Sequence, residues 1–105
     1  MGSFDFVLMT VEEVAPVEED SKIYIFLKKI CKMVDKICEY TDIDETESEC
    51  INGTLIISLN GCSFQEQRKC QLLSLLLDEA DKFKINNKGD NRISMIFEFN
   101  LGIKK

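Results

Sequence analysis

The dipeptide Asn52-Gly53 constrains the fold of this chain most, because it lies between two short runs of β-type residues. Both central positions of a type I′ turn need a positive φ angle, which asparagine and glycine adopt readily. We therefore predict a hairpin in which residues 46–51 pair antiparallel with residues 54–60. The alternative is a single strand that the chain enters through Gly53.

Two other segments carry the signals of amphipathic helices. Within residues 20–40, apolar side chains recur at spacings of three and four, and lysines occupy the remaining face. Ser63 and Glu66 have the spacing of a capping box, which predicts a second helix over residues 63–84. The apolar stripes consist of Ile23, Leu27, Ile30, Val34 and Ile37 in the first helix, and of Leu72, Leu73, Leu76, Leu77, Ala80 and Phe83 in the second.

Both ends of the chain are predicted to be strands. Residues 3–11 are apolar on both sides of an extended chain, and residues 92–101 alternate between apolar and polar side chains. The predicted order is β-α-β-β-α-β in one α+β domain over residues 1–105. This order is typical of a ferredoxin-like plait, with two helices on one face of an antiparallel sheet and residues 46–51 at its edge. A three-stranded α/β layer with two helices is the alternative.

The chain is acidic, and its negative charge is concentrated in two places. It has 19 acidic and 13 basic residues and no histidine, for a net charge of −6. Five acidic residues lie within residues 12–20 and five within residues 42–49. Phosphate binding needs a cationic surface, so we expect no nucleic-acid partner. No apolar run has the length of a membrane span or of a secretory h-region, so we expect a cytoplasmic protein without a membrane partner.

The sequence contains no complete catalytic or metal-binding motif of a familiar kind. The run from Asp42 resembles an EF-hand loop in its first positions, but Glu47 and Gly53 stand where that loop needs glycine and glutamate. The five cysteines lack the paired spacing of a zinc site, and Cys31 and Cys38 are predicted to lie in the core. Cys62 precedes the second predicted helix but has no histidine base. We therefore expect neither an enzyme nor a bound metal or cofactor.

Among the remaining functions, the charge distribution favours a protein-binding module. Acidic inhibitors and immunity proteins neutralise basic partners such as nuclease toxins through complementary charge. We expect the second acidic run to make most of the contact and the first to serve the start of the helix. The alternative is a regulatory or assembly module that homodimerises and binds a small ligand, and a small enzyme is a third class. The predicted partner-binding residues are Asp42, Asp44, Glu45, Glu47 and Glu49.

Overall fold

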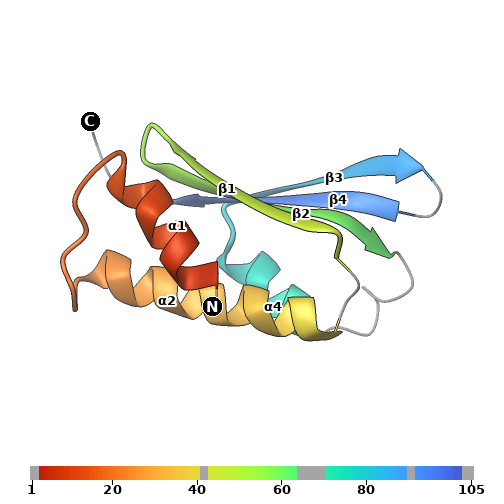
Figure 1. The fold of residues 1–105 in the computed structure, drawn as a ribbon, viewed down its shortest axis with the longest axis horizontal. Coiled ribbons are helices and arrows are strands. Elements are labelled where there is room, and N and C mark those ends of the chain that lie inside the picture. Colours follow the sequence, from red (N-terminus) through yellow and green to blue (C-terminus); the bar gives the residue numbers. More distant parts are fainter. Residues whose placement is uncertain (1–2, 41–42, 64–70, 90–91, 103–105) are drawn as a thin grey trace.

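The structure is a computed structural model and describes residues 3–40, 43–63, 71–89 and 92–102. Within these residues the chain forms three helices and one four-stranded antiparallel sheet, so it has an α+β fold. The helices lie on one side of the sheet (Figure 1). The elements are α1 (Ser3–Glu12), α2 (Lys22–Tyr40), β1 (Glu45–Ile51), β2 (Thr54–Ser63), α4 (Gln71–Glu79), β3 (Lys82–Gly89) and β4 (Arg92–Asn100).

The sheet order is β1-β2-β4-β3, which places β2 and β4 at the centre and β1 and β3 at the two edges. The hairpin prediction is confirmed, since β1 pairs with β2 from Glu45 opposite Asn60 to Ile51 opposite Thr54. Asn52 and Gly53 between them have φ angles of 52° and 79°, as a type I′ turn requires. The second acidic run therefore begins an edge strand, as predicted.

The ferredoxin-like plait is not the observed arrangement, because the first predicted strand is the helix α1. Phe4, Val7, Leu8 and Val11 have the spacing of one helical stripe, and the helix turns them toward the core, where Val7 and Val11 are buried. An extended chain would have put these four side chains on both faces. The three-stranded alternative is also wrong, since the sheet has four strands.

The prediction of one helix over residues 63–84 is also incorrect at both ends. Ser63 is the last residue of β2, and Lys82 already begins β3. Residues 64–66 of the predicted capping box lie outside the described residues. Phe83 continues the leucine spacing of the preceding helix, but it also alternates with lysines, and in the structure it packs against Phe97 from the neighbouring strand.

Helix α2 forms where predicted, although its start is different. The hydroxyl of Ser21 accepts a hydrogen bond from the backbone N of Tyr24 at 3.1 Å, so Ser21 caps the helix. The preceding acidic residues do not occupy its first turn, contrary to the role we expected for them. The apolar stripe of α2 nevertheless faces the sheet as predicted.

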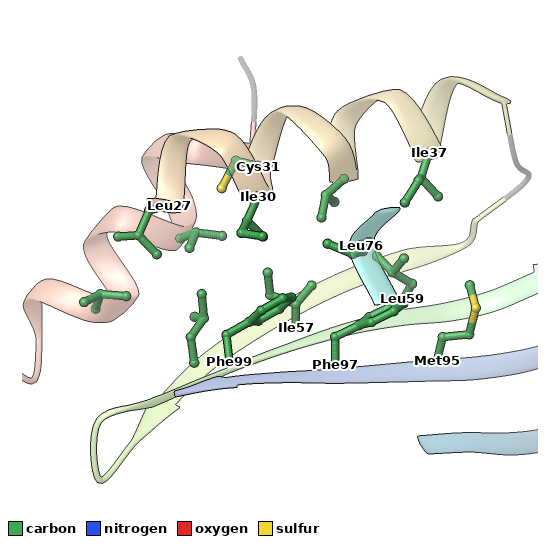
Figure 2. Packing of buried hydrophobic residues seen from close by; sticks show 14 of the residues in the cluster. Leu27, Ile30, Cys31, Ile37, Ile57, Leu59, Leu76, Met95, Phe97 and Phe99 are labelled. Carbon is green, nitrogen blue, oxygen red and sulfur yellow. The ribbon is translucent and has the colours of Figure 1, made fainter. Parts of the chain in front are cut away.

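The core lies between α2 and the two central strands, with the first helix and α4 closing its sides. Figure 2 shows side chains of α2 pointing toward side chains of β2 and β4. At about 25 cal/mol for each Å² of apolar surface removed from water, this layer is the main source of stability. Its labelled members are Leu27, Ile30, Cys31, Ile37, Ile57, Leu59, Leu76, Met95, Phe97 and Phe99.

Candidate functional site

Three carboxylates of β1 lie on the face of the sheet that points away from the helices, here called the open face. Thr46 and Ser48, the residues between them, point toward the helices. The Ser48 hydroxyl lies 3.1 Å from that of Thr10 on α1, which shows this orientation. Successive side chains of a strand point to opposite faces. The open face therefore receives the acidic column, defined as Glu45, Glu47 and Glu49.

The acidic column is exposed, and within the described part of the chain none of its members forms an ion pair. Glu45 and Glu47 interact with each other instead. A side-chain hydrogen bond with Glu47, followed by the repulsion between the two charges, raises the pKa of Glu45. The column thus concentrates negative charge that the described residues leave without a counterion.

Asp44, another predicted partner-binding residue, forms an ion pair within the molecule. Its Oδ1 lies 2.5 Å from Nη2 of Arg92, so its charge is balanced within the molecule. Its carboxylate also occupies the space that a Cβ on Gly61 would need. Asp44 therefore joins the start of β1 to β2 and β4. Asp42, the first residue of the predicted site, lies outside the described residues.

A small pocket beside the acidic column adds an aromatic ring to these carboxylates. The pocket has a volume of about 260 Å³. Phe6 contributes from α1 with 56% of its surface exposed. Ligand sites for drug-sized molecules are usually larger than about 300 Å³, so this pocket is closer to the size of a single side chain. It is lined by Phe6, Glu47, Ser48, Glu49, Ile56 and Ser58.

The opposite edge of the open face is basic, which the sequence reasoning missed. Lys82 lies opposite Glu98 and Lys84 opposite Ile96 in the pairing of β3 with β4. Both lysines are exposed and form the basic column. The alternation of lysines with Phe83 and Ile85 could have indicated a strand, but the helical reading of this segment hid it.

The cysteines do not assemble into a reactive site within the described residues. Cys31 is buried in the core as predicted, whereas Cys38 is exposed on α2, contrary to prediction. Although Cys38 is exposed, its thiol group is partly desolvated, and this desolvation raises the pKa of the thiol. Cys38 therefore carries less thiolate than an ordinary cysteine. The side chain of Cys62 lies outside the described ones. In the same part of the chain, no three side chains of the metal-ligating types are grouped to hold an ion.

Comparisons with protein-family models, with curated proteins and with solved structures found no match to this chain. None of the helices in the described segments is long and apolar enough to cross a membrane.

Proposed function

We propose that the chain is a small acidic protein-binding module of the inhibitor or immunity type, which acts in the cytoplasm by neutralising a basic partner such as a nuclease toxin. The observation that carries this proposal is the acidic column on edge strand β1, whose three carboxylates form no ion pair within the described residues. Like charges held in one column repel each other, and a cationic surface relieves that repulsion on binding.

The pocket beside the column supports a lysine or arginine of the partner as its occupant. The exposed ring of Phe6 offers a cation–π contact, and Glu47 and Glu49 offer charge-assisted hydrogen bonds. An arginine fits this combination best, because its planar group can stack on a ring and pair with a carboxylate at once. Asp44 is not included in the proposed contact, since Arg92 already occupies it.

Reversal of the acidic column tests this function. Affinity capture with the wild-type chain as bait should retain a basic protein, and the chain should inhibit the activity of that protein. The triple variant Glu45→Lys, Glu47→Lys and Glu49→Lys should bind it at least about a hundredfold more weakly, because several charge pairs become repulsive. The association rate of the wild type should also fall as salt is added.

A matched variant separates the site from net charge. Glu12 and Glu13 are exposed at the end of α1, and they neither belong to the acidic column nor line the pocket beside it. Reversal of both, together with Glu18→Lys, changes the charge by the same amount and should leave the affinity within about threefold of wild type. Equal losses in the two triple variants, or capture of the same partner by the column variant, would remove the acidic column from the proposed site.

A further inference from the structure

The open face carries opposite charges along its two edges, and the register aligns them in rows. Glu47 is opposite Ser58, which is opposite Ile96, which is opposite Lys84. The next row runs from Glu49 through Ile56 and Glu98 to Lys82, so Lys82 also has a carboxylate of its own chain beside it. Each row therefore begins with a carboxylate and ends with an ammonium group, three strand spacings or roughly 14 Å away.

This pattern is complementary to a rotated copy of itself. Consider two open faces stacked about a twofold axis that lies parallel to the strands, between β2 and β4. The rotation keeps the height of each row and places β1 of one copy over β3 of the other. Glu47 then faces Lys84 of the second copy, and Glu49 faces its Lys82. A twofold axis repeats both contacts, as an isologous interface requires.

The charges also exclude the other way of stacking two such faces. A twofold axis perpendicular to the strands would place β1 over β1 and β3 over β3, so that like charges would meet along both edges. Only the parallel axis brings opposite columns together. Half-buried Ile56 and Ile96 supply apolar surface at the centre, and half-buried Glu98 also lies there, beside Lys82 of its own chain and facing Ile56 of the second copy. Aligned sheets pack at about −30°, and the flexible lysine side chains can span the resulting offset.

We propose that a second copy of this chain covers the open face in this parallel-axis arrangement. The proposal goes beyond the proposed function, because it needs no foreign partner. Within the described residues, no helix lies on this side of the sheet (Figure 1). Such a dimer buries the acidic column, so self-association competes with the binding of a basic protein. In the dimer, the partner-binding surface is therefore covered until the two copies dissociate.

The size of the face sets the expected strength of the dimer. Four strands of seven residues present roughly 450 Å² per copy at ordinary strand spacings. Stable specific interfaces bury about 800 Å² per partner, so this contact is at the low end. We therefore expect a reversible dimer that forms with a dissociation constant in the micromolar range or weaker and that dissociates as salt is added.

Two charge-reversed variants test the arrangement by sedimentation velocity over a series of concentrations. Glu47→Lys with Glu49→Lys makes all four facing positions positive, and Lys82→Glu with Lys84→Glu makes all four negative. Each variant should self-associate at least about tenfold more weakly than wild type. An equimolar mixture should associate again, because each column then meets its opposite. The variants carry net charges of −2 and −10, so attraction between net charges cannot explain that recovery.

Controls and contrary results are equally specific. Lys28→Glu with Lys32→Glu makes the same charge change on the exposed side of α2 and should leave the dimer within about twofold of wild type. Circular dichroism checks that every variant is folded. A wild-type chain that stays monomeric at millimolar concentration overturns the proposal. So does a mixture that associates no better than its separate components, because this outcome assigns any dimer to another surface.

Discussion

Glu45 shows how one residue on the exposed edge of a sheet can respond to pH. The hydrogen bond with Glu47 and the repulsion between the two groups raise the pKa of Glu45 in the folded chain. A carboxyl group with a raised folded pKa binds its proton more tightly in the folded state than in the unfolded state. Ionisation of Glu45 at neutral pH therefore opposes folding.

We predict that Glu45→Gln raises the melting temperature at pH 7, because it removes the ionisation that opposes folding. The difference from wild type should shrink as the pH falls through the raised pKa and vanish below about pH 4, where both states are protonated. Thermal unfolding followed by circular dichroism at a series of pH values measures it. A gain at pH 7 that persists below pH 4 would contradict this explanation.

At the scale of elements, Gly61 in β2 allows an irregularity in the sheet and also leaves space for a contact between the start of β1 and β4. The register between β2 and β4 shifts between Leu59 and Cys62, and Gly61 lies in this shift with a φ angle of 78°. Glycine adopts this conformation without the steric cost that a Cβ brings. The same absence of a Cβ leaves room for the Asp44 carboxylate that pairs with Arg92.

We predict that Gly61→Ala lowers the free energy of unfolding by about 2–4 kcal/mol. About 1 kcal/mol comes from the positive φ angle, and the rest comes from displacement of Asp44, which weakens its ion pair with Arg92. Gly89→Ala is the matched control, because Gly89 has a φ angle of 81° but nothing lies within 4 Å of its added Cβ. Urea denaturation should show a clearly smaller loss for Gly89→Ala, and equal losses would mean that the contact with Asp44 contributes nothing.

The two misassigned elements, α1 and β3, have apolar residues whose spacing fits both a helix and a strand. The apolar residues of α1 satisfy both a helical stripe and a strand covered on two faces, and only the packing of Val7 and Val11 against the core decides between them. Phe83 belongs to a helical leucine pattern and to a strand alternation at the same time. The backbone N of Asp81 donates to the carbonyl of Glu98 at 2.8 Å, so pairing with a distant strand turns this segment into β3.

At the scale of the whole molecule, stability depends on a single layer between the helices and the central strands. Phe97 is fully buried there, and its ring centroid lies 5.0 Å from that of Phe83. Because β4 is central in the sheet, the Phe97 side chain lies in the core layer, to which every described helix contributes side chains. A cavity at Phe97 therefore affects the whole domain and not one edge.

We predict that Phe97→Ala lowers the free energy of unfolding by about 3–5 kcal/mol, a large fraction of the 5–15 kcal/mol typical of a domain. Phe97→Leu should cost about half as much, because it leaves a smaller cavity. Ile25→Ala, at a side chain that is 59% exposed, should stay within about 0.5 kcal/mol of wild type. Urea denaturation measures all three, and a loss at Phe97 no greater than that at Ile25 would contradict the assignment of the core.

The sequence by itself determined those elements whose signals lie within a short stretch of the chain. The spacing of apolar residues predicted α2 and its buried stripe, the Asn52-Gly53 dipeptide predicted the hairpin, and the alternation of apolar and polar side chains, broken only at Ile96, predicted β4. These signals are reliable because each one is complete within a turn or a few residues of the chain. They also placed Glu47 and Glu49 on an edge strand.

Only the tertiary structure decided which charges share a surface. Asp44 and Arg92 are separated by 48 residues, and their ion pair exists because β1, β2 and β4 lie side by side. The lysines of β3 reach the same face as the glutamates of β1 through two intervening strands. Strand alternation predicts which residues point together, but the pairing of distant strands decides which face they share and which charges lie across it.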